Sequence, residues 1–302
     1  MDWIEGLQRS VDYIEDHLTE AIDYEKVAAQ CFSSSYHFQR VFSILCGFTI
    51  GDYIRNRRLS LAGALLASSD AKVIDIALKF GYESPDSFAK AFKKFHGILP
   101  SHARNDGSKL RSYSRLVLNI SLEGGTPMDY RIEKKPEMIL TGYKAHFTGA
   151  PFGEDRKRQE EELFITTRGK QWFLCGASGG SDAHCVISNI TEEGYDFYYC
   201  HPLDDWNREN LFNRNVTGVD FVEDLGLENI YIPETTYVIF ETKKTEKPIC
   251  DYFDLLGLRI SILTEWMPDM GFRLSNAPEL AVYHWNPRSE RNIQIWMPIE
   301  KA

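Results

Sequence analysis

Hydrophobic residues in the first hundred positions recur every three or four residues, which is the period of an amphipathic helix. Five apolar residues between Ile4 and Leu18 follow this period, and similar runs come after them. Prolines interrupt the stretch only at Pro85 and Pro100. The pattern therefore predicts an all-helical region over about residues 2–104.

This helical stretch contains an internal repeat with an offset of 50 residues. Each copy is predicted to hold a short helix, a tight turn and a longer helix with two buried phenylalanines, which is the helix-turn-helix pattern. The second copy has a clear helix start, with Ser84 as N-cap, Pro85 at the first helical position and Asp86 beside it. The superimposed pairs are Ala28 and Leu78, Phe38 and Phe88, Arg40 and Lys90, Phe42 and Phe92, and Gly47 and Gly97.

One further helix is predicted between the two copies, from about Asp52 to Ala67. Its length of about 24 Å follows from a rise of about 1.5 Å per residue. Three arginines, Arg55, Arg57 and Arg58, cluster near its start. A rod of this length can hold two recognition helices on successive major grooves of one duplex, which lie about 34 Å apart.

The pattern changes to short apolar runs with a period of two in the second part of the chain. Residues 108–127 are polar and rich in glycine, which indicates a linker between a domain at 1–107 and a domain at 128–302. Within this linker, residues 116–120 could dock as a strand. The second domain is predicted to be α+β, with two strand-helix-strand-strand halves. Its predicted strands are Tyr130–Glu133, Met138–Phe147, Val186–Thr191, Tyr195–His201, Thr236–Thr242, Leu280–His284 and Ile293–Ile299, and its predicted helices are about 154–168 and 247–265.

The composition is typical of a soluble globular protein, because 43% of the 302 residues are hydrophobic and 26% are charged. The longest weakly polar run, Leu59–Ala67, is shorter than the roughly 18 apolar residues that a membrane span needs. The start of the chain lacks the features of a signal peptide. The six cysteines form no CxxC pair. We therefore expect reduced thiols and a cytoplasmic location.

The net charge of −10 lies entirely in the second part of the chain. Residues 1–127 carry 15 basic and 15 acidic residues, so residues 128–302 carry the remaining 19 and 29. Eight of the acids lie in residues 1–25, whereas residues 87–104 hold four basic residues and no acid. Such a basic face can contact phosphates, because salt screens charges beyond a Debye length of about 8–10 Å.

The repeat and the helix between its copies resemble the DNA-binding domain of AraC/XylS-type transcriptional regulators over about 100 residues. The helix between the copies matches through Tyr53–Arg55, Arg58 and Ala62. The resemblance implies that the first recognition helix reads bases, since arginine can pair with guanine and glutamine with adenine. It also implies mainly phosphate contacts in the second copy. The second-copy residues that match are Gly81–Ser84, Phe88, Lys90, Phe92–Lys94, Gly97, Pro100, Ser101 and Arg104. The predicted DNA contacts are Tyr36, His37, Gln39, Arg40, Arg55, Asp86, Ser87, Lys90, Lys93 and Lys94.

The second domain resembles the GyrI-like effector-binding domain, a duplicated βαββ, SH2-like fold. The residues that carry this likeness are Thr235–Phe240, Glu265–Pro268 and Ile293–Ile299. The whole chain then resembles AraC/XylS-type regulators of Rob-type architecture, with an all-α paired helix-turn-helix domain followed by an α+β GyrI-like domain.

The resemblance places a ligand pocket near the strand and helix ends of the second domain. In the family an acidic residue often meets cationic ligands at the position that Ala281 occupies here. Without that carboxylate, aromatic stacking remains, so we expect a small, flat, aromatic effector that is neutral or weakly cationic. The predicted ligand-binding residues are Trp172, Phe240, Glu265, Trp266 and Tyr283.

The most consistent function is a DNA-binding transcriptional regulator, an activator, controlled by a small-molecule effector. Its expected partners are promoter DNA and RNA polymerase, and it needs no metal or cofactor. The spacing of Cys175, His184 and Cys185 matches no common zinc site. The alternatives are that the second domain is a small-molecule hydrolase or a protein-docking module.

Overall fold

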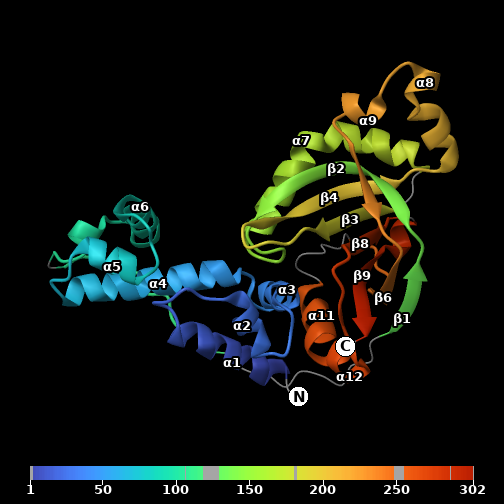
Figure 1. The fold of residues 1–302 in the computed structure, drawn as a ribbon. Helices are drawn as coiled ribbons and strands as arrows, with labels where there is room; N and C mark the ends of the chain where they lie inside the picture. Colours follow the sequence, from blue (N-terminus) through green and yellow to red (C-terminus); the bar gives the residue numbers. More distant parts are fainter. Residues whose placement is uncertain are drawn as a thin grey trace. The chain divides into compact units, whose positions relative to one another are not determined.

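The computed structural model describes residues 3–105, 107–117, 129–179, 182–247, 255–285 and 287–301. The chain divides into two compact units (Figure 1). The helical unit consists of Met1–Phe42 and Phe48–Leu122, and the sheet unit consists of Ser43–Gly47 and Glu123–Ala302.

The helical unit repeats one arrangement of two helices. The longer helix of the first copy, α3, begins and ends 50 positions before its counterpart α6. Gly47 and Gly97 follow these helices with φ angles of 73° and 81°, which glycine adopts without steric cost. The predicted helix-turn-helix repeat is therefore present. Its elements are α1 (Trp3–Asp16), α2 (Tyr24–Ala29), α3 (Ser35–Cys46), α4 (Ile50–Ser68), α5 (Val73–Lys79), α6 (Pro85–His96) and a 3₁₀ turn η1 (Pro100–His102).

The two phenylalanines of each copy form part of its core. The ring centroids of Phe38 and Phe42 lie 5.9 Å apart, and those of Phe88 and Phe92 lie 5.4 Å apart. All four side chains are fully buried. A spacing of four residues places each pair on one face of its helix, and this explains why the hydrophobic pattern predicts them correctly.

Residues 108–117 pack against the helical unit. The Tyr113 amide donates to Ser60 Oγ at 3.0 Å, and the Leu116 amide donates to the Tyr53 hydroxyl at 3.0 Å. The first half of the segment that the composition predicts as a linker is thus held along α4. Residues 118–128 lie outside the described part of the chain.

The sheet unit is built on one antiparallel sheet with the strand order β1-β6-β9-β8-β3-β4-β2-β5, and β7 pairs with β9. Two successive strand-helix-strand-strand units run through it, as predicted, from β2 to β4 and from β6 to β9. Its strands are β1 (Tyr130–Lys135), β2 (Met138–Thr148), β3 (Ala183–Ser188), β4 (Gly194–Pro202), β5 (Glu228–Ile232), β6 (Thr235–Glu241), β7 (Phe272–Leu274), β8 (Glu279–His284) and β9 (Asn292–Lys301).

The helices of the sheet unit differ from the prediction in length. Helix α7, which is predicted to end at about residue 168, continues to Ala177. In the second predicted helix, residues 247–265, α11 begins at Leu256, and residues 248–254 lie outside the described part. Strand β3 begins three residues earlier than predicted, and β5, β7 and the helices between β4 and β5 are additions. The helical segments are α7 (Asp155–Ala177), η2 (Asn207–Leu211), α8 (Arg214–Thr217), α9 (Phe221–Asp224), α11 (Leu256–Ser261), η3 (Ile262–Trp266), α12 (Met267–Met270) and η4 (Arg288–Glu290).

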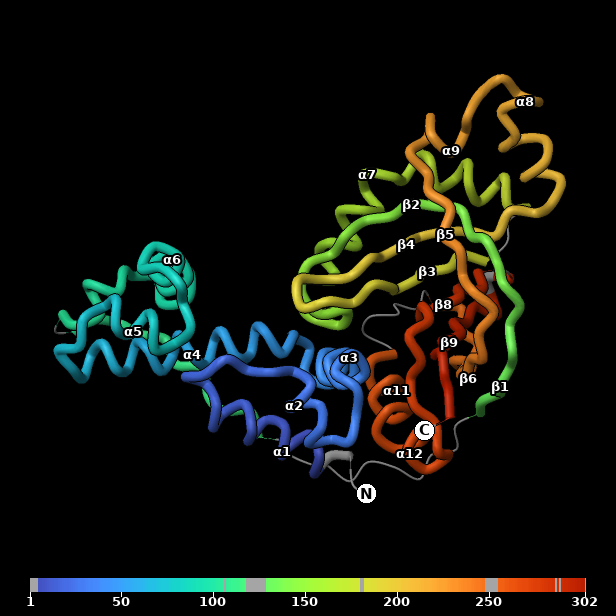
Figure 2. Tube along the Cα trace, viewed as in Figure 1, coloured from blue at the N-terminus to red at the C-terminus, as the bar shows by residue number. Residues whose placement is uncertain are grey.

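Chain connectivity makes the sheet curl. Strand β1 lies at one end of the strand order and β2 lies next to the other end, yet only Pro136 and Glu137 join them. Two residues span only a few ångströms, so the two ends of the sheet must approach each other. Figure 2 shows β1 continuing into β2 around the end of the sheet. The curl gives the sheet an inner and an outer face.

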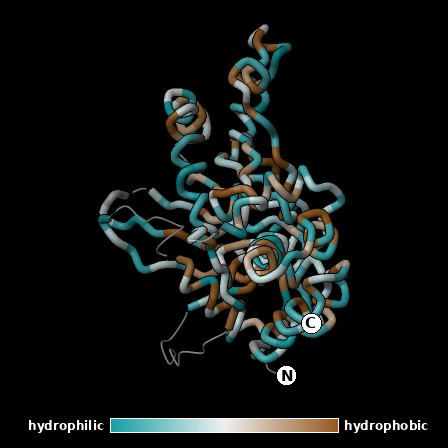
Figure 3. The backbone as a smooth tube through the Cα atoms, turned by 90° about the vertical axis from the view of Figure 1, so that its left-hand side faces the viewer, coloured by the Kyte–Doolittle hydropathy of each residue, from teal (hydrophilic) through white to brown (hydrophobic). Residues whose placement is uncertain are grey.

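Helices pack on the outer face of this sheet. Leu174 of α7 shares a buried cluster with Tyr143 of β2, and Arg259 of α11 pairs with Glu279 of β8 at 2.7 Å. The inner face carries its own apolar cluster, which draws on β2, β3, β4, β5, β6, β8 and β9 and contains no described helical residue. Figure 3 shows hydrophobic and hydrophilic residues alternating along the backbone, as elements with one buried side require.

Candidate DNA-binding surface and effector site

Helix α6 begins with the capping arrangement that the sequence predicts. The Ser87 amide donates to Ser84 Oγ at 3.2 Å, Pro85 occupies the first turn, and Asp86 carries a negative charge there. A serine cap satisfies an amide that has no partner within the helix, and an acid in the first turn complements the helix dipole. The start of this helix is therefore held rigidly on the surface.

Three lysines of α6 are exposed and have no partner among the described residues. Lys90, Lys93 and Lys94 make no hydrogen bond or ion pair with any described residue. Phe88 and Phe92 on the same helix are fully buried, so one side of α6 faces the core and another carries the positive charges. The exposed side also contains Asp86 and Ser87. Such a surface can approach a polyanion without breaking any internal contact.

The first recognition helix, α3, differs from α6. Tyr36, His37 and Gln39 are half-buried, and Gln39 Nε2 donates to Ser35 Oγ at 3.0 Å. Arg40, which the sequence predicts to contact a base, is 2% exposed. A side chain in that state cannot reach a base edge, so the prediction for Arg40 is corrected for this conformation.

The three arginines near the start of α4 have different roles. Arg55 is 54% exposed and pairs with Asp52 of its own helix. Arg57 forms two short contacts with Glu15 of α1, and Arg58 donates to the carbonyl oxygens of Leu18 and Glu20. Only Arg55 of these three keeps a largely exposed guanidinium.

The structure does not assemble the predicted ligand pocket. Phe240 and Trp266 do meet, with ring centroids 5.6 Å apart, but both are buried where the helical segment η3 covers the outer face. Tyr283 stacks on Trp285 at 5.2 Å, and Trp172 is 75% exposed on α7. Glu265 is exposed on η3 and is not brought to these rings by any described contact. Strand and helix ends alone do not show which face of each strand the helices cover, and the structure therefore separates residues that the sequence groups together.

The inner face instead presents an aromatic residue on each side of an aliphatic floor. Paired strand positions join Trp296 to Leu280, Leu280 to Val186, and Val186 to Tyr198. The two aromatic residues are three strand spacings apart, which is about 14 Å along the curved sheet. Leu280 and Val186 are fully buried, whereas Trp296 and Tyr198 are 8% and 7% exposed. We call this arrangement of two aromatic residues and an aliphatic floor the inner-face site.

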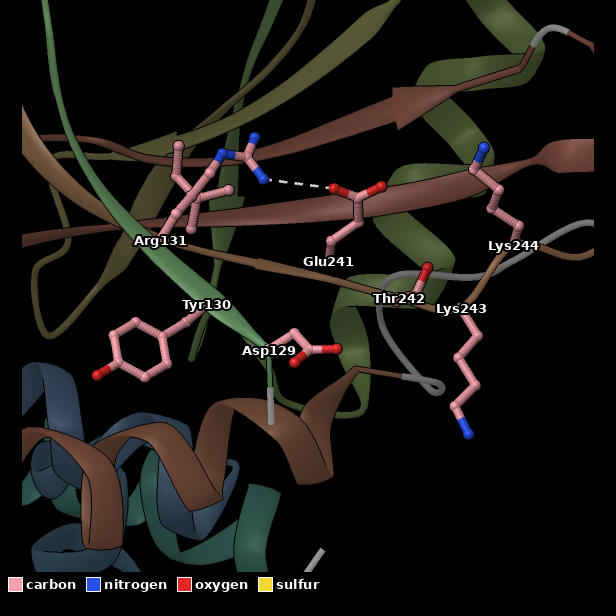
Figure 4. Close-up of a pocket in the computed structure, with 8 residues that line it drawn as sticks. Asp129, Tyr130, Arg131, Glu241, Thr242, Lys243 and Lys244 are labelled. Atoms are coloured by element: carbon pink, nitrogen blue, oxygen red, sulfur yellow. Dashed lines mark hydrogen bonds and ion pairs between the residues drawn. The ribbon is translucent and has the colours of Figure 1, made fainter. Parts of the chain in front are cut away.

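A hollow of about 390 Å³ lies beside this site, at one edge of the sheet. Arg131 and Ile239 line it, and Ile239 is the strand neighbour of Trp296. Figure 4 shows Arg131 and Glu241 pointing toward each other, while Tyr130 points to the opposite side of β1. The guanidinium of Arg131 and the carboxylate of Glu241 are 3.3 Å apart. An arginine and a glutamate that neutralise each other's charge therefore lie at the rim of the hollow.

His184 adds no charge to the inner face at neutral pH. His184 lies on this face next to Val282, and its ring is 6.3 Å from that of Trp296. Burial lowers the pKa of His184 to about 4. The imidazole is consequently neutral, and it adds a polar but uncharged edge to the aromatic floor.

Comparison with known proteins identifies the family. Residues 27–106 match the family model described as a helix-turn-helix domain. The chain is 36% identical over 196 residues to an uncharacterized HTH-type transcriptional regulator, YbfP, of Bacillus subtilis, covering 57% of this chain and 66% of that one. It is 42% identical over 89 residues to the HTH-type transcriptional activator AarP of Providencia stuartii, covering 30% and 66%.

The regulatory protein SoxS of Escherichia coli is 32% identical over 99 residues, and the match covers 92% of SoxS and 33% of this chain. The chain belongs to the AraC family of helix-turn-helix transcriptional regulators. This AraC-family chain spans just under two thirds of the length of YbfP and of AarP. Among solved structures, the EcmrR C-terminal domain aligns with 59% of this chain and 100% of its own length, at 16% identity and a TM-score of 0.38.

Two features of this AraC-family regulator could not have been found by sequence reasoning. The inner-face site depends on strand pairing between residues as distant as Val186 and Leu280. The separate roles of Arg55 and Arg57 depend on where Glu15 lies. In the described residues no helix is both long and apolar enough to span a membrane. Within that same part of the chain, no group of three or more His, Cys, Asp or Glu side chains could hold a metal ion.

Proposed function

We propose that this chain binds duplex DNA through both helix-turn-helix copies and activates transcription in response to a small molecule bound in the sheet unit. The observation that carries the DNA proposal is the exposed side of α6, where Lys90, Lys93 and Lys94 have no partner among the described residues. Lysines act as point charges toward phosphates, so α6 supplies mainly orientation and salt-dependent affinity.

In this proposal, helix α3 makes the contacts with bases. Tyr36, His37 and Gln39 are partly exposed, and the Gln39 amide can pair with an adenine edge. Arg40 can join them only in a conformation that exposes its guanidinium. In this proposal Arg55, whose side chain is 54% exposed, contacts a phosphate between the two recognition helices. AarP is named as an activator, and this supports the same role here, with RNA polymerase as the second partner.

The DNA proposal is tested by binding of the full-length chain to its promoter site and to random duplex, each over a range of salt concentrations. Lys93→Ala should weaken both duplexes about equally and reduce the slope of log K against log salt by about 0.9. Gln39→Ala should weaken the promoter site by about 1–3 kcal/mol and random duplex much less. Lys109→Ala, an exposed lysine outside both copies, is the control and should change neither. A slope near zero in the unmodified chain would rule out the DNA proposal.

The effector proposal rests on the inner-face site. Its aromatic pair and aliphatic floor suit a small planar aromatic molecule. In this proposal the inner-face site takes the place of the pocket that the sequence predicts near the strand and helix ends. Binding there would favour one state of the protein over another and so alter DNA or polymerase binding by a population shift.

Thermal unfolding of the full-length chain with 1-methylnaphthalene tests the effector site. The compound should raise the melting temperature, because it binds only the folded protein. Trp296→Leu and Tyr198→Leu should each weaken its binding about tenfold, since each removes a stacking ring while keeping an apolar side chain. Trp206→Leu, which changes a 67% exposed tryptophan outside the inner face, serves as the control. Equal effects at Trp206 and Trp296 would rule out the inner-face site.

A further inference from the structure

Each aromatic residue of the inner-face site already holds a cation. Lys135 Nζ lies 4.6 Å from the centroid of the Trp296 ring, and Lys144 Nζ lies 5.5 Å from that of Tyr198. Both distances are within the roughly 6 Å range over which an ammonium is attracted to the π-face of a ring. The two lysines come from β1 and β2, strands that the pairing order places near opposite ends of the sheet.

Both lysines are also fixed by a carboxylate. Lys135 pairs with Glu133 two residues earlier on β1, and Lys144 pairs with Asp196 of β4 at 3.2 Å. The hydrogen bond that Lys144 donates to Asp196 raises the pKa of Lys144, so this ammonium stays charged. Hydrogen bonds from Lys135 and Arg131 lower the pKa of Glu133, so this carboxylate stays charged and paired.

The other acids of the inner face are engaged or peripheral. Glu241 pairs with Arg131 and accepts hydrogen bonds from Asn292 and Gln294. Glu228 lies on the edge strand β5, opposite Gly142, and is exposed to solvent. Asp182, at the end of the same face, pairs with His284 at 2.6 Å. Among the described acids of this face, Glu228 is therefore the one without a cationic partner, and its charge acts on Tyr198 from the edge of the sheet.

A second cation would meet an unfavourable environment at these rings. An ammonium already held on a ring competes with it, either for the same face or by repulsion through the ring. The carboxylates beside the two lysines, Glu133 and Asp196, cannot compensate, because each already has a cationic partner. A neutral planar molecule meets no such penalty, and the carboxylate of an acidic one can accept a hydrogen bond from the N–H groups that the two ammoniums keep beyond their ion pairs.

We propose that Lys135 and Lys144 set the charge preference of the effector site, so that it takes neutral or acidic planar aromatic molecules and rejects organic cations. This inference rests on the proposed inner-face site. Of the neutral or weakly cationic effectors that the sequence alone suggested, it keeps the neutral ones and excludes the cationic ones.

Three bicyclic probes of nearly the same shape test the charge preference on the full-length chain. They are 1-methylquinolinium, which is a cation, 1-methylnaphthalene, which is neutral, and 1-naphthoate, which is an anion. The unmodified chain should bind the cation at least about tenfold more weakly than the neutral probe, and the anion at least as well as the neutral probe.

Variants then assign this preference to the two lysines. The double substitution Lys135→Met and Lys144→Met should strengthen binding of 1-methylquinolinium about tenfold or more, because it frees both rings and removes one cationic partner each from Glu133 and Asp196. The neutral probe should change by less than about threefold. Lys134→Met is the matched control, since Lys134 is on the same strand, points to the other face and pairs with Glu234 at 2.6 Å. It should leave all three affinities unchanged.

Failure of the charge preference and failure of the site give different results. If Trp296→Leu weakens all three probes but the unmodified chain prefers the cation, or if the double substitution leaves the ratio of cation to neutral affinity unchanged, the role of the lysines is overturned. If Trp296→Leu changes no probe, the inner-face site itself is overturned, and the assignment of the lysines falls with it.

Discussion

At the scale of single residues, the contact between Gly63 of α4 and His96 of α6 shows how closely the second helix-turn-helix copy is packed. A Cβ atom on Gly63 would lie 2.6 Å from His96 Cε1. The imidazole cannot easily move, because Nε2 is 2.9 Å from the Leu59 carbonyl oxygen and Nδ1 accepts from the Arg111 amide at 3.1 Å. Burial lowers the pKa of His96, which keeps the ring neutral and able to accept that hydrogen bond.

We predict that Gly63→Ala lowers the free energy of unfolding of the helical unit by about 1–3 kcal/mol, because the added methyl group must displace a fixed ring. Gly169→Ala in α7 is the matched control. Nothing lies within 4 Å of a Cβ built at Gly169, so this substitution should stabilise its unit by about 0.5–1 kcal/mol through helix propensity. Thermal and urea unfolding followed by circular dichroism measures both. A stabilising Gly63→Ala would show that the His96 ring relaxes freely.

At the scale of elements, α4 connects the two helix-turn-helix copies and also anchors α1 and the segment after α6. Arg57 and the Tyr53 hydroxyl both donate to the Glu15 carboxylate of α1, and Tyr53 also accepts from the Leu116 amide. Burial favours the neutral form of Glu15, but the hydrogen bonds from Arg57 and Tyr53 outweigh it and lower the pKa of Glu15. Its contribution to stability is therefore complete above the ordinary glutamate pKa and is lost as the pH falls through the lowered value.

We predict that Arg57→Met costs about 3 kcal/mol of stability at pH 7, since it leaves the buried Glu15 carboxylate without its partner. Arg55→Met, two residues away on the same helix, should change stability by less than about 0.5 kcal/mol because the Arg55–Asp52 pair is exposed. Denaturant unfolding at pH 7 and pH 4 compares them. The cost of Arg57→Met should shrink at the lower pH as Glu15 becomes protonated. Equal costs for the two arginines would contradict this assignment.

At the scale of the whole molecule, charge separates the two parts of the chain. Residues 1–127 are neutral overall, and residues 128–302 carry the entire net charge of −10. Lys90, Lys93 and Lys94 of α6 thus belong to a part without net charge, while residues 128–302 repel polyanions wherever they lie within a Debye length of the DNA. This arrangement limits binding to arbitrary sequences, because the non-specific component of DNA affinity is almost wholly electrostatic.

We predict that a fragment of residues 1–127 binds random duplex several-fold more tightly than the full chain at about 50 mM salt, and that the two converge above about 300 mM, where the Debye length is shorter than about 6 Å. Fluorescence anisotropy with a labelled random duplex measures both. A fixed difference at all salt concentrations would indicate that a cause other than charge separates them.

The sequence by itself determined the features that depend on local pattern. Helical spacing and the offset of 50 residues predicted that α3 and α6 are equivalent helices, because a phenylalanine pair four positions apart lies on one helix face and can pack into a core. The cap at Ser84 and the α+β order of the second part followed from equally local signals.

Tertiary structure alone decided which residues form sites. Phe240 and Tyr198 look alike as aromatic residues in strands, and only the pairing and the helices on the outer face place one under a helix and the other on the inner face. Likewise, Lys134 and Lys135 are neighbours whose side chains point to opposite faces of β1, and only the pairing of β1 with β6 and of β6 with β9 puts Lys135 on the face of Trp296. These contacts join residues that are far apart in the sequence, so no local pattern predicts them. The period of two along a strand shows which residues share a face of the sheet, but it does not show what covers that face.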